Sequence, residues 1–289
     1  MVKQLFILIR PKQYIKNLII YAPLFFSFRL FEIDKLLSAT LAFVLFSLIS
    51  SSVYIVNDIF DIKEDILHPV KRNRPIASGG IRIYNAIIIA FVLATSSLLL
   101  SFFISLEITY ILLTYLAINI LYSSWLKHTP IVDIFLISLG FILRIISGGI
   151  ATNIELSMWI IIITFLLSLF LAASKRREDV LLLIEGHKVR KSVDGYSTEF
   201  INAILIIISA VLIVSYILYT ISLDIQHKFG TNKLFITGFF VIIGILRYLQ
   251  IIIIEKINCN PTDILWKDGF LKITIFLWLL TFYLIVKLY

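Results

Sequence analysis

Three carboxylates and one amide recur at helical spacing in the segment Asn57-Asp58-Ile59-Phe60-Asp61-Ile62-Lys63-Glu64-Asp65. If this segment is helical, Asp58, Asp61 and Asp65 stack on one face, because residues three and four positions apart are neighbours on a helix. Stacked carboxylates repel one another and require a counter-charge. Mg²⁺ is suited to this role, since it binds one or two carboxylates and keeps water and phosphate oxygens as its other ligands. The segment predicts a Mg²⁺ site of Asn57, Asp58, Asp61 and Asp65, with Asp58 and Asp61 as the catalytic pair; the alternative is a solvated acidic helix end.

A basic run, Lys71-Arg72-Asn73-Arg74, follows the carboxylates directly and lies between two prolines. Pro69 and Pro75 cannot occupy a helix interior, so this run is expected in an extended or turned segment. Arginine binds phosphate oxygens bidentately, and lysine acts on them as a point charge. Together with the carboxylates, Lys71, Arg72 and Arg74 indicate a pyrophosphate site. The alternative is attraction of the run to anionic lipid.

Two further polar positions lie where an apolar chain would otherwise be expected. Lys16 and Asn17 follow a basic N-terminal stretch and could reach a phosphate at the membrane surface; an interfacial anchor is the alternative. Arg144 follows Asp133 by about three helical turns, so the two residues share a helix face. An arginine within a membrane span is costly and faces a partner or a polar cavity. Arg144 is therefore predicted to line a cavity and bind substrate, with a purely structural contact as the alternative.

Nine apolar runs are long enough to be membrane-spanning helices and would position these residues. Their Ile and Leu blocks are continuous and lack the period of two that strands of a transmembrane barrel show. The predicted fold is an all-α integral membrane protein with nine transmembrane helices. The runs lie near residues 14–31, 36–56, 83–104, 107–125, 131–151, 156–174, 200–221, 234–254 and 270–287.

The composition supports this class. The chain has 289 residues, of which 60% are hydrophobic and 15% are charged, whereas about 25% charged residues are usual in a soluble domain. One cysteine excludes an intramolecular disulfide. Most of the 26 Lys and Arg residues fall on the side of the N-terminus, which predicts a cytoplasmic N-terminus and a C-terminus on the opposite side of an inner membrane. The long cytoplasmic loops 57–82 and 175–199 are expected to cap one polytopic domain, residues 1–289.

The acidic motif, the nine predicted helices and the two long loops resemble the UbiA superfamily of intramembrane prenyltransferases. Within that superfamily, three segments are similar to the decaprenyl-phosphate phosphoribosyltransferase branch. They are Arg10-Pro11-Lys12-Gln13-Tyr14-Ile15-Lys16-Asn17, the run from His68 to Pro75, and Lys175-Arg176-Arg177-Glu178. The resemblance implies a helical bundle around a central cavity that faces the cytoplasm, and an acidic motif that binds Mg²⁺ and diphosphate.

The second long loop departs from the superfamily pattern. Prenyltransferases of the superfamily typically carry a second D-x-x-x-D motif there, whereas this chain is basic at that place. A basic segment suits an additional phosphate, such as the 5-phosphate that phosphoribosyl pyrophosphate has and a prenyl diphosphate lacks. The predicted phosphate-binding residues of this segment are Lys175, Arg176, Arg177, Arg190, Lys191 and Tyr196.

The expected function is Mg²⁺-dependent transfer of 5-phosphoribosyl from phosphoribosyl pyrophosphate to a polyprenyl phosphate of the decaprenyl type, with release of diphosphate, in cell-envelope precursor synthesis. The acceptor phosphate is ionised near pH 7, so no general base is required. One alternative is a prenyltransferase that uses a polyprenyl diphosphate and a small aromatic acceptor. A transporter is a further alternative, although most of the charge lies at one membrane surface rather than mid-membrane.

The expected partners are the two substrates and membrane lipid. Nucleic acid is not expected, because the aromatic residues that stack on bases lie mostly within the apolar runs. A homo-oligomer is left open.

Overall fold

The computed structural model describes residues 2–67, 70–186, 191–255, 264 and 267–288. These residues form helices and turns and contain no strand. The chain divides into two compact units, Met1–Ser157 and Met158–Tyr289, and each is described by itself. The single domain expected from the sequence stays a prediction.

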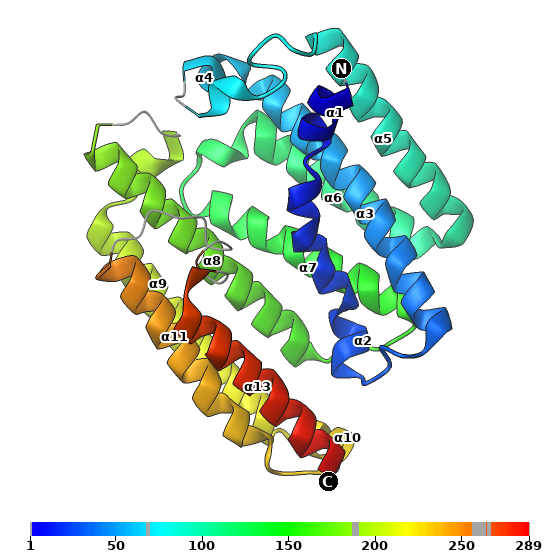
Figure 1. The fold of residues 1–289 in the computed structure, drawn as a ribbon, viewed down its shortest axis with the longest axis vertical. Coiled ribbons are helices and arrows are strands. Elements are labelled where there is room, and N and C mark those ends of the chain that lie inside the picture. The colour runs from blue at the N-terminus through cyan, green and yellow to red at the C-terminus, as the bar shows by residue number, and fades with distance from the viewer. Residues whose placement is uncertain (1, 68–69, 187–190, 256–263, 265–266, 289) are drawn as a thin grey trace. The chain divides into compact units, whose positions relative to one another are not determined.

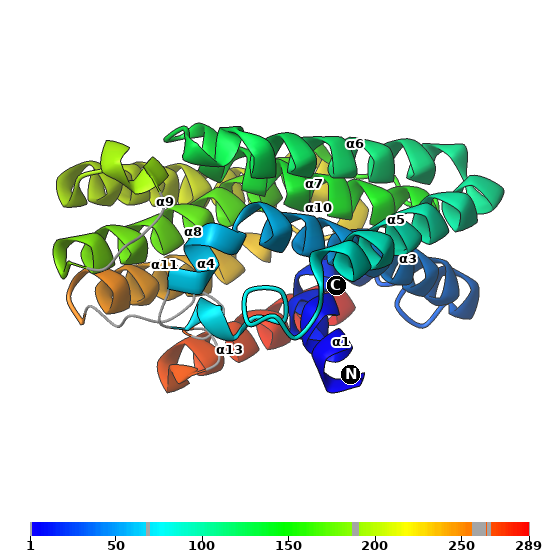
Figure 2. The same cartoon turned by 90° about the horizontal axis from the view of Figure 1, so that it is seen from above.

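The first unit is built around one long helix, α3. Helix α3 (Ile33–Phe60) packs against α5 (Ile83–Ile104), α6 (Leu106–Ser124) and α7 (Val132–Thr152). The helices α3 and α5 lie side by side in both views (Figures 1 and 2). The short elements of this unit are α1 (Val2–Ile9), η1 (Pro11–Tyr21), α2 (Ala22–Phe26), α4 (Ile62–Leu67), η2 (Lys71–Asn73) and η3 (Leu126–His128).

Apolar packing and hydrogen bonds from buried serine hydroxyls hold α3 in this unit. Its main core cluster includes Leu45, Phe46 and Ile49 of α3. Two serine hydroxyls also join α3 and α5: Ser52 donates to the Ala90 carbonyl at 2.7 Å, and Ser97 donates to the Leu45 carbonyl at 2.8 Å. Small hydroxyl residues of this kind let membrane helices approach closely and hydrogen-bond to each other. These interactions matter because lipid supplies no hydrophobic force between helices.

The second unit contains α8 (Met158–Ile184), η4 (Lys191–Gly195), α9 (Thr198–Ile221), α10 (Leu223–Phe229), η5 (Leu234–Ile236), α11 (Thr237–Ile253) and α13 (Gly269–Leu288). Helix α9 packs against both α8 and α11, and α13 packs against α11 (Figure 1). Ser197 caps the start of α9, and its hydroxyl accepts the Phe200 N–H at 3.1 Å. This bond satisfies one of the free N–H groups of the first turn.

Eight helices of the described residues are long and apolar enough to cross a membrane. Their outer faces carry large apolar side chains, such as Phe103 at 82% exposure and Phe91 at 67%. The count of nine helices and the side to which a cavity opens stay predictions.

The structure of residues 14–31 differs from the predicted membrane-spanning helix. This stretch forms the 3₁₀ helix η1 and the five-residue α2 rather than one long α-helix. The chain enters η1 through Arg10 at φ +53°, directly before Pro11. Gly148 of α7 packs on the η1 backbone so closely that a Cβ there would lie 2.1 Å from the Ile20 carbonyl oxygen. Close packing against α7 therefore constrains the path of η1.

The expected start of the second long loop, at residue 175, is also wrong. Helix α8 continues to Ile184, so Lys175, Arg176 and Arg177 lie within its last three turns. Two i,i+3 ion pairs support this continuation: Lys175 with Glu178 and Arg176 with Asp179, each at 2.6 Å. Similarly, residues 57–60 of the first expected loop belong to α3.

Candidate functional site

The acidic motif lies at the junction of α3 and α4. Asp58 is in the last turn of α3, Asp61 ends that helix, and Asp65 is in α4. The Asp61 N–H donates to the Asn57 carbonyl at 2.9 Å, and the Asp65 N–H donates to the Asp61 carbonyl at 2.8 Å. The chain therefore stays nearly helical, as the spacing predicts, with a break at Asp61. All three carboxylates are buried, with 2% to 4% exposure.

Asp58 and Asp65 share one arginine. Arg74 Nη1 lies 3.0 Å from Asp58 Oδ1 and 2.6 Å from Asp65 Oδ2. Arg10, at the junction of α1 and η1, forms a second ion pair with Asp58 Oδ1. The helix α1 packs on α3, which places Arg10 beside this carboxylate. Two arginines from segments far apart in the chain thus neutralise the end of α3.

Asp61 has a different cation, Lys127, which sequence reasoning missed. Lys127 lies in η3, between α6 and α7, and is 5% exposed. Its Nζ pairs with Asp61 Oδ1. The Asn57 side chain donates to Asp61 Oδ2 at 2.9 Å and accepts from the Ser123 hydroxyl at 3.3 Å, so the end of α6 also contacts α3 here.

The members of the predicted basic run lie in different environments. Lys71 and Arg72 are on η2, and Arg74 follows it. Arg74 reaches the carboxylates, whereas the side chain of Arg72 is exposed and that of Lys71 is half-buried. Arg74 thus joins the predicted basic run to the acidic motif, and the phosphate-binding role of the run stays a prediction.

Arg144 is the centre of a buried polar network in the first unit. Its Nε donates to Asn17 Oδ1 at 2.7 Å, Nη1 to the Gly140 carbonyl at 2.7 Å and Nη2 to the Tyr115 hydroxyl at 2.9 Å. Its guanidinium also lies over the rings of Phe46, Tyr115 and Phe141, at 5.2, 4.9 and 5.3 Å from their centroids. These contacts match the structural role that the sequence left as the alternative, and the role of Arg144 as a substrate ligand stays a prediction.

Asn17 links this network to α3. Its Nδ2 donates to the Ser47 hydroxyl at 3.0 Å, while its Oδ1 accepts from Arg144. Asn17 is 1% exposed, and Lys16 beside it is half-buried. The pair predicted to reach a phosphate therefore lies on η1, where Asn17 joins α3 and α7.

The basic residues of α8 make contacts within the second unit. Arg177 Nε donates to Asn202 Oδ1 of α9 at 2.7 Å, and Nη1 donates to the Ile252 carbonyl near the end of α11. Arg176 is 4% exposed and pairs with Asp179. Arg177 thus fastens three helices together, a role that sequence spacing did not indicate.

The remaining predicted residues of that segment are only partly described. Tyr196 is 5% exposed, and its ring stacks near that of Phe200 with centroids 6.3 Å apart. Arg190 lies outside the described residues, as does the side chain of Lys191. Their predicted roles stay predictions.

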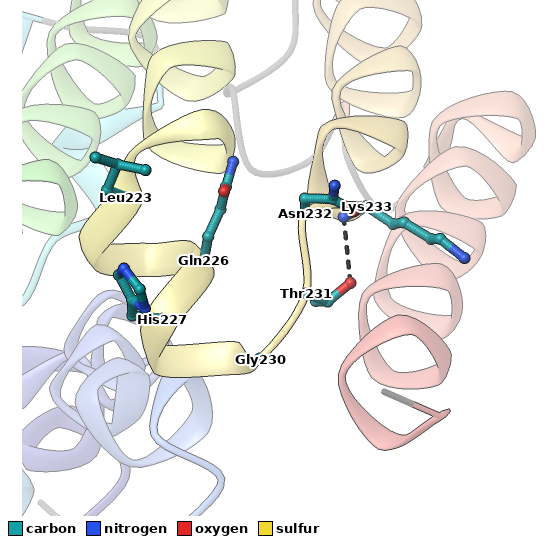
Figure 3. Close-up of a pocket in the computed structure, with 7 residues that line it drawn as sticks. All are labelled: Leu223, Gln226, His227, Gly230, Thr231, Asn232 and Lys233. Carbon is teal, nitrogen blue, oxygen red and sulfur yellow. Dashed lines mark hydrogen bonds between the residues drawn. The ribbon is translucent and has the colours of Figure 1, made fainter.

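The second unit also has an open pocket of about 470 Å³ at the end of α10 (Figure 3). Gln226 and His227 line one side, and the turn through Thr231 and Lys233 lines the other, with the Lys233 N–H donating to Thr231 Oγ1 at 3.2 Å. None of the predicted site residues lines this pocket.

The donor atoms at the acidic cluster suit Mg²⁺, because they are carboxylate and amide oxygens. Among the residues that the structure describes, no three His, Cys, Asp or Glu side chains are placed to hold a metal ion together. The ion pairs explain this arrangement: Arg74 lies between Asp58 and Asp65, and Lys127 holds Asp61. The set fits Mg²⁺ in its chemistry, and each of its three carboxylates is paired with a basic side chain.

Comparison with known proteins identifies the family. Residues 18–179, more than half of the chain, match the UbiA prenyltransferase family. The chain belongs to this family. As a UbiA family member with eight long apolar helices, it is an integral membrane protein and a transferase.

Its relatives and structural neighbours agree with this assignment. The UbiA family member is 33% identical over 282 residues to a decaprenyl-phosphate phosphoribosyltransferase of Mycolicibacterium smegmatis, covering 94% of this chain and 88% of that protein. It is 35% identical over 246 residues to a protein of the same name in Corynebacterium glutamicum, covering 83% and 74%. A UbiA homologue of Archaeoglobus fulgidus, solved bound to DMAPP and Mg²⁺, has a TM-score of 0.73 at 19% identity and 98% and 99% coverage, which shows the shared fold.

Proposed function

We propose that this UbiA family member transfers 5-phosphoribosyl from phosphoribosyl pyrophosphate to a polyprenyl phosphate and releases diphosphate. The observation that carries the proposal is the buried cluster in which Asp58, Asp61 and Asp65 stand against Arg10, Arg74 and Lys127. Carboxylates that hold Mg²⁺ beside cations that hold phosphate oxygens are what a diphosphate donor requires. The names of the relatives that align over most of the chain favour the phosphoribosyl donor over a prenyl donor.

The proposed metal ligands are Asn57, Asp58, Asp61 and Asp65. A UbiA homologue of Archaeoglobus fulgidus has been solved bound to Mg²⁺ together with DMAPP and together with GPP, which supports metal dependence of this family member. When bound, Mg²⁺ would neutralise charge that develops on the departing diphosphate. The carboxylates would orient the metal complex, and Arg10, Arg74 and Lys127 would hold the diphosphate oxygens.

In the proposed reaction, a phosphate oxygen of the polyprenyl phosphate attacks C1 of the ribose. A new bond forms between C1 and that oxygen while the bond from C1 to the diphosphate oxygen breaks, which inverts the anomeric carbon. The attacking phosphate is already ionised near pH 7, so no side chain needs to remove a proton. This accounts for a site built from carboxylates and cations. We place the site on the cytoplasmic side of an inner membrane and assign the product to cell-envelope precursor synthesis.

The experiment compares two donor and acceptor pairs with the purified protein and Mg²⁺. One incubation contains radiolabelled phosphoribosyl pyrophosphate and decaprenyl phosphate, and the other contains polyprenyl diphosphate and 4-hydroxybenzoate. We expect lipid-linked label in the first incubation and its loss in Asp58→Ala and Asp61→Ala. Product in the second incubation alone would replace the proposal with an aromatic prenyltransferase.

A further inference from the structure

The carboxylates at the end of α3 are matched by basic side chains. Among the described residues, the cluster contains three carboxylates and three cations, and each carboxylate is in at least one ion pair. The cations come from three segments, the α1–η1 junction, the stretch after η2, and η3. The carboxylates are nearly inaccessible to water, so solvent cannot replace a lost partner cheaply.

This pairing opposes the binding of either half of the ligand alone. A metal ion that took the carboxylates would leave the basic side chains without counter-ions in a buried place, and an unpaired buried charge is strongly unfavourable. A diphosphate that took the basic side chains would leave the carboxylates unpaired for the same reason. Only a metal ion and a diphosphate together give every charge in the cluster a new partner.

We propose that Arg10, Arg74 and Lys127 are exchangeable counter-ions. Before substrate binds they neutralise Asp58, Asp61 and Asp65; on substrate binding they pass to the diphosphate oxygens while the carboxylates take Mg²⁺. The exchange couples the two ligands, so that each raises the affinity for the other by the same factor. This inference rests on the Mg²⁺ and diphosphate site of the proposed function and adds the coupling between its two ligands.

Lys127 is the cation whose removal tests the exchange most directly. It is the most buried of the three basic side chains, at 6% side-chain exposure against 24% for Arg10 and 23% for Arg74. It pairs with Asp61 and not with the carboxylates that Arg74 bridges. Its ammonium is a point charge on a flexible stem, so it can follow a phosphate oxygen without the fixed geometry of a guanidinium.

The first measurement is a titration with Mn²⁺ in the absence of phosphate. The electron paramagnetic resonance signal of the free ion reports how much Mn²⁺ is bound. We expect Lys127→Met to bind Mn²⁺ at least tenfold more tightly than the wild type, because Asp61 has lost its cation. Lys63→Met is the matched control, since Lys63 is an exposed lysine of the same acidic segment, and its Mn²⁺ affinity should equal that of the wild type. The double variant Asp61→Asn with Lys127→Met should not show the increased Mn²⁺ affinity of Lys127→Met, because it lacks the Asp61 carboxylate.

The second measurement is binding of inorganic pyrophosphate alone, by calorimetry in the presence of a chelator. Here Asp61→Asn should bind at least tenfold more tightly than the wild type, because Lys127 is released from its carboxylate. This arm keeps the inference testable even when Lys127→Met does not fold. Equal Mn²⁺ affinity of folded Lys127→Met and wild type, or equal pyrophosphate affinity of Asp61→Asn and wild type, would overturn the exchange.

Neither measurement involves turnover. A protein that shows both affinity gains and yet transfers no phosphoribosyl group would disprove the proposed function and leave the exchange intact. A protein that transfers the phosphoribosyl group and shows neither affinity gain would disprove the exchange and leave the proposed function intact.

Discussion

Lys127 of η3 and Asp61 at the end of α3 form a buried ion pair between positions 66 residues apart in the chain. Both side chains are almost fully buried, at 6% and 5% exposure. The pair ties the connection between α6 and α7 to the acidic motif, and it sets the counter-charge that a metal ion would meet there.

Removing one member of this pair should destabilise the first unit. Breaking a buried ion pair costs about 3–5 kcal/mol, because the remaining charge has no partner. We therefore expect Lys127→Met to unfold at a clearly lower temperature than the wild type in detergent. The double variant Asp61→Asn with Lys127→Met should recover part of the loss, and Lys63→Met should unfold like the wild type. Equal thermal stability of Lys127→Met and wild type would show that the pair contributes nothing.

Arg74 should be required for binding the donor. One guanidinium nitrogen of Arg74 contacts both Asp58 and Asp65, so its loss removes a cation from two buried carboxylates and leaves Asp58 paired with Arg10. A hydrogen bond to a charged group contributes about 1.5–3 kcal/mol, which corresponds to roughly a 10- to 100-fold change in affinity. We expect Arg74→Met to raise the KM for phosphoribosyl pyrophosphate by this factor, and Arg74→Lys to retain part of the affinity because it keeps the charge. Arg72→Met is the variant for comparison. If it raised the KM for phosphoribosyl pyrophosphate as much as Arg74→Met does, the contacts of Arg74 with Asp58 and Asp65 would not explain the effect.

Arg144 should stabilise the folded protein, and a positive charge at this position should not be sufficient for that stability. The guanidinium makes three short hydrogen bonds and lies among three aromatic rings, and a lysine cannot reproduce that geometry. Leaving buried polar partners unsatisfied costs about 1–3 kcal/mol for each group. Both Arg144→Met and Arg144→Lys should lower the unfolding temperature measured by tryptophan fluorescence. A folded Arg144→Lys with wild-type stability and a raised KM would instead support a role in substrate binding.

Gly148 should not tolerate a side chain. A Cβ at this position would lie 2.1 Å from the Ile20 carbonyl oxygen, so the η1 backbone must move. Overpacking of this kind costs about 1–3 kcal/mol and occasionally more. Gly148→Ala should therefore reduce thermal stability, whereas Gly244→Ala, whose Cβ would meet the nearest atom at an ordinary 3.7 Å, should not. Similar unfolding temperatures for the two variants would contradict the close packing of α7 on η1.

The contact between Arg247 and Asp268 predicts a pH dependence in the second unit. Arg247 Nη2 donates to Asp268 Oδ2 at 2.8 Å, and this hydrogen bond holds the pKa of Asp268 below its ordinary value of 3.8. Since the folded pKa is lowered, the contribution of the pair is complete above pH 3.8 and is lost as the pH falls through the folded pKa. The wild type should be more stable than Arg247→Met at pH 7, and the difference should shrink below about pH 4. Unfolding curves of both proteins from pH 7 to pH 3 would measure this decrease in the stability difference. A stability difference that stays constant over this range would contradict the prediction.

The sequence alone determined the class of the protein and predicted the acidic cluster at the end of α3. Eight of the nine predicted runs are long helices, because a span of apolar residues in hydrocarbon must satisfy its backbone hydrogen bonds within itself. The spacing of Asp58, Asp61 and Asp65 predicted the acidic cluster, and the nearby basic run supplied Arg74. These features are local, and the regular rise of a helix fixes which residues are neighbours.

Only the tertiary structure decided which cations face those carboxylates and which face elsewhere. Lys127 reaches Asp61 from 66 residues away, and Arg144 reaches Asn17 from 127 residues away, so neither contact follows from helical spacing. The arginines of α8 resemble a phosphate site in the sequence, whereas in the structure Arg177 binds Asn202 and the Ile252 carbonyl. A buried charge takes whichever partner the packing of distant helices brings within reach, and that packing depends on the whole fold.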